Sequence, residues 1–170
     1  MPSNKVLRGS TSIWAFRPEA FANPALPTAA EMNSVIYGTD ISCAVEDAYT
    51  LNLTDSDTDD SLSVCDTGQS QTPTSANYEA SLDLFADESS TASGVFNKAR
   101  DLFRKKGNDY YLLKRLNIAQ GTTVAIGQVL YIYKVRTDNI QLLTDRGEAV
   151  KYGARFKPQG EAYSDVVVAA

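Results

Sequence analysis

The chain has 170 residues, a net charge of −5 and no histidine. Its length suits one domain with a core of its own. Without histidine, Ser-His-Asp and Cys-His catalysis are excluded and the commonest transition-metal ligand is missing. We therefore expect a protein that is not an enzyme and uses no cofactor. No window approaches the ~18 apolar residues of a membrane span and no signal peptide is visible, so we expect cytoplasmic synthesis and no membrane insertion.

Charge is unevenly divided along the chain. Residues 1–90 carry 14 acidic and three basic residues, whereas residues 91–170 carry seven acidic and 13 basic residues. Such a division can steer one subunit of an assembly onto the next. It also disfavours tight binding of nucleic acid, because the chain as a whole is acidic.

The composition predicts a mainly β fold. Apolar residues make up 43% of the chain, and its nine tyrosines outnumber its six phenylalanines. Val, Ile, Thr and Tyr fit strands better than a helical bundle.

The first 40 residues are predicted to form an N-terminal arm and loop, followed by a single β-rich domain over residues 41–170. Three prolines, at positions 18, 24 and 27, interrupt both helix and strand. The aromatic side chains of Trp14 and Phe16 pack either on their own domain or on another subunit, and both interpretations stay open.

Alternation of apolar and polar residues predicts strands over 41–46, 49–53, 61–65 and 78–85. The acidic run 54–60 is predicted to be the tip of a long hairpin, and residues 66–77 a mobile loop. The two cysteines, Cys43 and Cys65, are too few for a disulfide framework. We expect reduced, half-buried thiols on strands.

One helix is predicted, over about residues 92–106. Its apolar residues fall on a single stripe, with serines and threonines before it and bases in its last turn ahead of Gly107. Further strands are predicted at 110–118, 129–136, 139–143, 149–157 and 165–169, with a turn at 158–160. This order, strands then one helix then strands, favours a β-sandwich or half-barrel with one flanking α-helix.

The acidic run also partly matches a calcium-binding loop. Asp55, Asp57, Asp59 and Asp66 match four ligand positions of a calcium loop, but Asp60 replaces the glycine that the turn needs. A solvated acidic loop is the favoured interpretation. Paired acids elsewhere in the chain are neighbours on strands and point to opposite faces, which disfavours a carboxylate-based hydrolase.

Several features of organisation together carry a resemblance to a known family: the chain length, the Pro-rich segment up to Pro27, the acidic segment around 55–60, the single helix at 95–103, and the ending 156–161 followed by three valines at 166–168. The chain resembles the major tail proteins of long-tailed bacteriophages, in particular those of phages that infect actinobacteria.

The resemblance implies a tail-tube-type β-sandwich in hexameric rings that stack into a tube within the virion, assembled in the host cytoplasm. It implies partners as well: copies of the chain itself, a tape-measure protein, tail-end proteins, and DNA in transient passage during ejection. An acidic bore would keep phosphates from adhering to its wall.

Carried onto this sequence, the resemblance implies bore-facing acids among Glu46, Asp47, Glu79 and Asp83. It also implies contacts between subunits, whose candidates are Trp14, Phe16, Asp55, Asp57, Asp59, Asp60, Arg100, Arg104, Lys105 and Lys106. Two other interpretations remain open: a monomeric β-sandwich that binds calcium or carbohydrate, and a related ring protein of the tail end.

Overall fold

The protein is built on one eight-stranded antiparallel sheet, seen here in a computed structural model that describes residues 11–59, 72–89, 91, 93–144 and 149–170. Seven strands run in the order β2-β1-β5-β6-β8-β4-β3, and β7 pairs with β8 beside them. This confirms the mainly β class with a flanking helix. The strands are β1 (Ser12–Phe16), β2 (Gly38–Asp40), β3 (Thr50–Asp59), β4 (Thr72–Phe85), β5 (Asp109–Arg115), β6 (Val129–Thr137), β7 (Gln141–Leu143) and β8 (Lys151–Val167). The helices are α1 (Ala29–Met32) and α2 (Val95–Phe103), with 3-10 turns η2 (Pro18–Ala20) and η3 (Ser42–Ala44).

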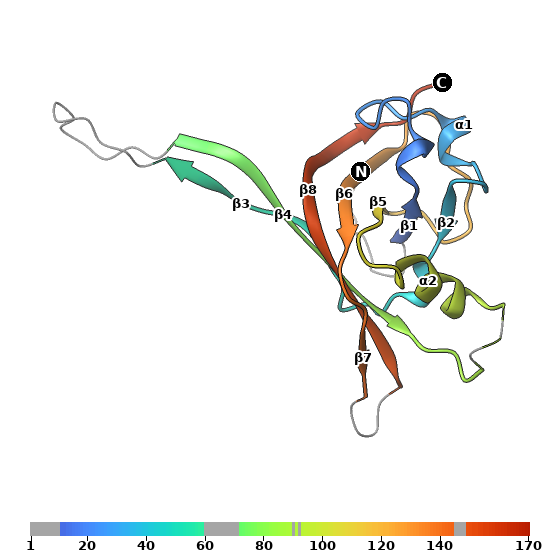
Figure 1. Ribbon diagram of the computed structural model, residues 1–170. Coiled ribbons are helices and arrows are strands. Elements are labelled where there is room, and N and C mark those ends of the chain that lie inside the picture. Colours follow the sequence, from blue (N-terminus) through green and yellow to red (C-terminus); the bar gives the residue numbers. More distant parts are fainter. Residues whose placement is uncertain (1–10, 60–71, 90, 92, 145–148) are drawn as a thin grey trace, which may run out of the picture.

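Strand β8 divides the sheet into two halves. Its residues 151–155 pair with β4, and residues 156–167 pair with β6. We call β2-β1-β5-β6 the rear half-sheet and β7-β8-β4-β3 the front half-sheet. Figure 1 shows the long β8 bending between them, while β3 and β4 extend away from the body.

The main core lies where the two half-sheets and α2 face one another. Leu82 and Leu84 of β4, Leu112 of β5 and Val135 of β6 are completely buried in it. Phe103 of α2 packs edge-on against the rings of β5 and β8, at centroid distances of 5.4 and 5.0 Å. Both half-sheets thus share one apolar interior, as expected for a sandwich or half-barrel.

A second core covers the other face of the rear half-sheet. Leu113 of β5 and Ile132 of β6 point into it, and η2, α1 and the chain near residue 124 close it. Strand β5 is therefore buried on both faces, which explains its nearly continuous apolar sequence.

The expected N-terminal arm is instead part of the fold from Ser12 onward. Strand β1 lies between β2 and β5, and Phe16 is fully buried in the second core. Where the prolines interrupt the strands, Thr28 and Glu31 form a capping box that starts α1. The first ten residues lie outside the described residues.

The strand predicted over 41–46 was wrong. Ile41 and Ala44 are both buried, a spacing of three that suits the 3-10 turn η3, while Cys43 is exposed. Cys43 is therefore neither half-buried nor on a strand. The strand predicted over 61–65, with Cys65, lies outside the described residues.

The predicted strands at 49–53 and 78–85 are confirmed within β3 and β4. The acidic run is not a hairpin tip, however, because residues up to Asp59 continue β3. Residues from Thr72 likewise belong to β4 and not to a loop. Paired strands satisfy the backbone of this polar segment, so its composition did not prevent strand formation.

The predicted helix is confirmed as α2, with Ala99 and Phe103 buried in the main core. It is shorter than expected, and its N-cap residue is Gly94, which provides no side-chain hydrogen bond, so the predicted serine and threonine caps were wrong. No helix in the described part of the chain is long and apolar enough to span a membrane.

The predicted strands at 110–118, 129–136 and 139–143 correspond to β5, β6 and β7, but those at 149–157 and 165–169 belong to one strand. The turn predicted at 158–160 is a bulge in β8, where the two-residue step from Tyr133 to Val135 faces the four-residue step from Pro158 to Ala162. The Tyr78 hydroxyl bridges the gap: it accepts a hydrogen bond from Gln159 N–H at 2.7 Å and donates one to the carbonyl of Lys134.

Candidate assembly site

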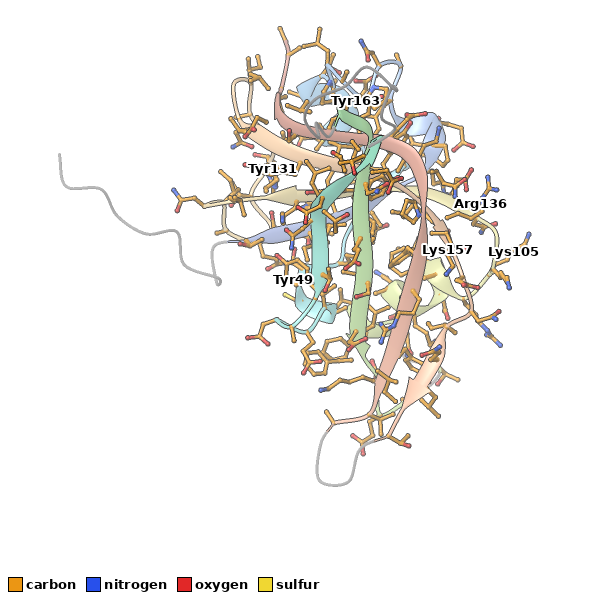
Figure 2. All side chains as sticks on the ribbon, turned by 90° about the vertical axis from the view of Figure 1, so that its left-hand side faces the viewer. Tyr49, Lys105, Tyr131, Arg136, Lys157 and Tyr163 are labelled. Atoms are coloured by element: carbon orange, nitrogen blue, oxygen red, sulfur yellow. The ribbon has the colours of Figure 1, made fainter. Side chains whose placement is uncertain are left out.

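The front half-sheet has one face turned away from the core, and this outer face is polar. On β4, the core residues Tyr78, Ala80, Leu82 and Leu84 alternate with outward residues. Those outward residues are Asn77, Glu79, Ser81 and Asp83, with Thr50, Asn52 and Thr54 on β3 and Lys151 and Arg155 on β8. Figure 2 views the molecule from the side on which β3, β4 and β8 run side by side.

An ion pair crosses this outer face between β8 and β4. Arg155 Nη1 lies 2.6 Å from Asp83 Oδ1. Gly153, the partner of Asp83 in the ladder, leaves room for the arginine, because a Cβ there would lie only 3.0 Å from the Arg155 guanidinium. The glycine lets the arginine lie flat across β8 to reach its acid.

A second ion pair joins Lys151 to Glu46, at 2.6 Å. Of the four acids predicted for the bore, Glu46 and Asp83 thus pair with bases of β8, while Glu79 and Asp47 are exposed. Glu46 and Asp47 follow η3 and are not on a strand, contrary to expectation, although the Glu46 N–H bonds to the Asp83 carbonyl at 2.8 Å. The outer face therefore has mixed charge.

The hairpin of β3 and β4 carries the exposed acids Asp55 and Asp57. Asp57 accepts a hydrogen bond from the Asn77 amide of β4 at 2.9 Å. Asp60 and Asp66 lie outside the described residues. An extended strand cannot wrap successive carboxylates around one ion as a calcium loop does, and within the described residues no three Asp, Glu, Cys or His side chains come together.

Strands β3 and β7 form the two edges of the front half-sheet. Within the described chain, β3 pairs only with β4 and β7 pairs only with β8. We call the unpaired side of each of these two strands its open edge. Each carries an exposed leucine, Leu53 on β3 at 45% and Leu142 on β7 at 60%. Unpaired backbone groups and apolar side chains at an open edge allow a further strand to add there.

We call the first residues of β3, 50–52, the root of this strand. Lys114 of β5 blocks the open edge at this root. Its Nζ donates to the Leu51 carbonyl and to Asn52 Oδ1, each at 2.7 Å. Burial lowers the pKa of this lysine from its ordinary value. It lies in the wall of a cavity of about 390 Å³ beside η3, which Cys43 and Tyr49 also line.

Bases gather around the end of α2. Arg100 pairs with Asp101 at 2.9 Å, which raises the arginine pKa, and its guanidinium lies 5.8 Å from the centre of the Tyr152 ring. Arg104 is exposed and, with Arg100, Ile140 and Tyr152, lines a cavity of about 450 Å³.

The basic surface continues beyond the helix. Lys106 and Lys157 share one acid, Asp138, at 3.3 and 3.6 Å. The pKa of that carboxyl is lowered by the N–H of Asn139 and then by Lys106 and Lys157. Lys105, Arg136 and Lys157 lie along one margin in Figure 2. The predicted bases thus lie on one surface, which also includes two bases that the sequence did not suggest, Arg136 and Lys157 (Figure 2).

The two aromatic candidates for subunit contacts differ in placement. Trp14 is half-buried and stacks on Phe16 at 5.8 Å, with the Arg115 guanidinium 5.4 Å from its ring. Phe16 is fully buried within its own chain, because β1 is an inner strand and not an arm, and cannot reach a neighbour.

Sequence reasoning missed Leu53, Leu142 and Lys114. Apolar residues of short strands give no sign of lying at a sheet edge, since edges follow from pairing order. Lys114 lies between the buried Leu113 and Arg115 of β5, and its partners are 62 and 63 residues away in the sequence. Only Leu53, at the start of an otherwise polar stretch, carried a signal.

Open sheet edges and opposed charge clusters are features by which a mainly β structural protein can assemble with copies of itself. The family comparison agrees: the family described as phage tail tube protein matches residues 1–170. The chain belongs to this family, and it is a structural component of a phage tail that assembles into a tube. No curated protein matches the chain.

Proposed function

We propose that six copies of the chain form a ring, that rings stack into the tail tube, and that DNA passes through the bore on ejection. The observation that carries this proposal is the pair of open edges, β3 and β7, on either side of the front half-sheet. A heterologous contact between two different edges closes into a ring when it is repeated around an axis. The number six is what the family resemblance implies.

The strand directions of the front half-sheet suit such a ring. Each neighbouring pair in β7-β8-β4-β3 is antiparallel, so β3 and β7 run in opposite directions. Copies related by rotation keep their orientation, so β3 of one copy meets β7 of the next in antiparallel sense. Four strands per copy thus continue one antiparallel barrel.

In this ring the outer face of the front half-sheet lines the bore. Its bases Lys151 and Arg155 are held by Glu46 and Asp83, so they are less available to bind phosphate. The exposed Glu79 adds repulsion. A wall of paired charges, hydroxyls and amides favours passage of DNA over binding. A tape-measure protein would fill the same bore beforehand, and tail-end proteins would cap the tube.

The projecting hairpin is proposed to reach a copy in the adjacent ring. Its acids Asp55 and Asp57, with Asp59 and Asp60, would meet the basic surface around Arg100, Arg104, Lys105 and Lys106. A single exposed ion pair contributes only about 0–1 kcal/mol, but a ring repeats each contact. The half-buried Trp14 stays a candidate for a further contact between copies.

The test is assembly of the purified full-length chain, followed by light scattering and electron microscopy. The proposal predicts rings or tubes, with tube length reduced when Asp55, Asp57, Asp59 and Asp60 are all changed to Asn. A chain that remains monomeric at high concentration, with a melting temperature that rises on addition of calcium, would instead support the monomeric binding module. Isolated rings that never stack would indicate a tail-end ring protein.

A further inference from the structure

The two open edges of the front half-sheet match each other residue by residue. This match rests on the proposed ring and concerns the register in which neighbouring copies join. Three properties of an edge residue decide whether it can pair: the side to which its backbone groups turn, the face of its side chain, and whether its edge is accessible.

On β3, Leu53 turns its backbone groups toward the open edge. The Leu51 carbonyl accepts a hydrogen bond from Lys114, on the side away from β4. Alternate residues of an antiparallel strand turn their N–H and C=O to the same side. Leu53, two residues on, therefore offers its own N–H and C=O to a further strand.

On β7, Leu142 does the same. The Asp83 carbonyl bonds to Glu46 on the side away from β8, so the next residue, Leu84, turns toward β8. Leu84 pairs with Tyr152, which pairs on its other side with Leu142. Tyr152 turns its backbone groups to β4, away from β7, so Tyr152 and Leu142 form a non-hydrogen-bonded pair. In such a pair both residues turn their backbone groups away from each other, and those of Leu142 therefore turn to the open edge.

The two side chains also lie on the same face of the sheet. Leu53 is opposite Tyr78, and Leu142 is opposite Tyr152; both tyrosines pack toward the main core. At 45% and 60% exposed, the two leucines would bury apolar surface by meeting. Directly opposed apolar pairs stabilise an antiparallel junction.

Lys114 rules out the neighbouring register. A strand placed two residues nearer the root of β3 would need to bond to the Leu51 carbonyl. That carbonyl already accepts a hydrogen bond from Lys114, whose ammonium group also donates to Asn52 Oδ1. A charged side chain at a strand edge disfavours the pairing of a further strand there. The accessible part of the edge therefore begins at Leu53.

We propose that Leu53 of one copy forms a hydrogen-bonded pair with Leu142 of the next, with Lys114 as the positioning residue that excludes the register at Leu51. Leu142 is level with Leu84 of β4, and Leu53 is level with Tyr78, six residues earlier in that strand. Each copy thus shifts the register by six residues across four strands.

This shift fixes the tilt of the strands. Six residues at about 3.3 Å give roughly 20 Å along the strands, and four strands at about 4.8 Å give roughly 19 Å across them, hence a tilt of about 45°. Closed barrels have tilts of roughly 35–45°. The tilt does not depend on the number of copies, because the shift along the strands and the width across the strands both increase in proportion to that number.

Disulfide cross-linking in assembled tubes tests the register. In a full-length chain with Cys43→Ser and Cys65→Ser, the variant Leu53→Cys, Leu142→Cys is assembled and mildly oxidised. We expect a ladder of covalently joined copies on a denaturing gel. The matched control, Leu53→Cys with Thr144→Cys, is two residues out of register and too far for a disulfide, so it should link at least about tenfold less.

Hydrogen exchange on the unmodified chain gives a second readout that does not depend on the cysteine variants. Assembly should slow exchange at the Leu53 and Leu142 amides by at least about tenfold, while the Asn52 amide, turned toward β4, should change little. Adding Lys114→Met to Leu53→Cys, Ile140→Cys should increase cross-linking, because the register at Leu51 becomes accessible.

The outcomes separate this inference from the proposed function. Tubes in which the out-of-register pair links better, or in which the Leu53 and Leu142 amides stay unprotected, would overturn the register and leave the ring intact. A chain that forms neither rings nor tubes would overturn both.

Discussion

The rear and front half-sheets are continuous through β8, yet they bury their residues differently. In the rear half-sheet, Leu112 and Leu113 of β5 point into opposite cores and are both completely buried. In the front half-sheet, Leu82 is buried while its neighbour Asp83 lies on the outer face. A strand covered on both faces contributes stability, whereas a strand covered on one face keeps a surface and an edge for other copies.

The largest effect on stability is expected from one of two matched leucine substitutions, Leu112→Ala and Leu142→Ala, which separate stability from assembly. Leu112→Ala should lower the free energy of unfolding by about 2–5 kcal/mol, because it leaves a cavity in the main core. Leu142→Ala, at an exposed edge, should change it by less than about 0.5 kcal/mol yet impair tube formation. Urea unfolding of the monomer and electron microscopy measure the two effects. Equal losses of stability in both variants would remove the distinction between the half-sheets.

A steric change in the rear half-sheet should come next. A Cβ added at Gly38 of β2 would lie 2.3 Å from the ring of the buried Phe16. Gly38→Ala should therefore cost about 1–3 kcal/mol of unfolding free energy, as overpacking does. Gly153→Ala in the front half-sheet, which meets only the movable Arg155 side chain, is the matched control. A thermal unfolding midpoint for Gly38→Ala that matches the wild type would contradict the tight contact.

Acid should weaken the junction between β8 and the rear half-sheet through Glu161 of β8. Lys134 donates to this carboxylate at 2.6 Å and, with the Tyr111 hydroxyl, holds its pKa below the ordinary value of 4.5. A carboxyl with a lowered folded-state pKa stabilises the fold above its unfolded pKa. That stabilisation is lost as the pH falls through the lowered value. Glu161→Gln should flatten this part of the stability profile, measured by urea unfolding between pH 3 and 7.

Glu79→Gln on the outer face is the control for this titration. Glu79 is exposed and lies on the front half-sheet. If both substitutions flatten the profile equally, the Lys134–Glu161 pair is not the source of the acid sensitivity.

The smallest effect on stability is expected for the ion pair of the outer face. Asp83→Asn removes the partner of Arg155, which is 36% exposed. The cost in unfolding free energy should be about 0–1 kcal/mol, since water screens such pairs. The freed arginine should nevertheless increase the amount of short, free duplex DNA that co-sediments with assembled tubes at low salt, with Ser81→Ala as the neutral control. An unchanged amount of bound DNA would argue against this face lining the bore.

Much of the fold was predictable because periodic burial leaves a local pattern. The stripe of α2 and the alternation of β4 both predicted their elements. Residues 41–46 were predicted wrongly because a six-residue window fits two periods, and burial of Ile41 and Ala44 favoured the turn. Pro158 and Gly160 signalled a turn, but the pairing of β6 along both sides of the bulge kept β8 continuous.

The assembly edges were beyond sequence reasoning for a different reason. Whether β3 or β7 lies at an edge depends on pairing among strands distant in the chain. The same holds for Lys114, whose role appears only when β5 lies next to the root of β3. The acidic candidates were found by charge alone, and charge could not foresee that Asp83 and Glu46 would be paired with β8.

Electron cryo-microscopy of the assembled tube tests the central claim most directly. The front half-sheets should join into one continuous antiparallel barrel, with β3 of each copy beside β7 of the next and strands tilted by about 45°. A tube in which β7 has no strand at its open edge, or in which β3 pairs with the rear half-sheet of a neighbour, would contradict it.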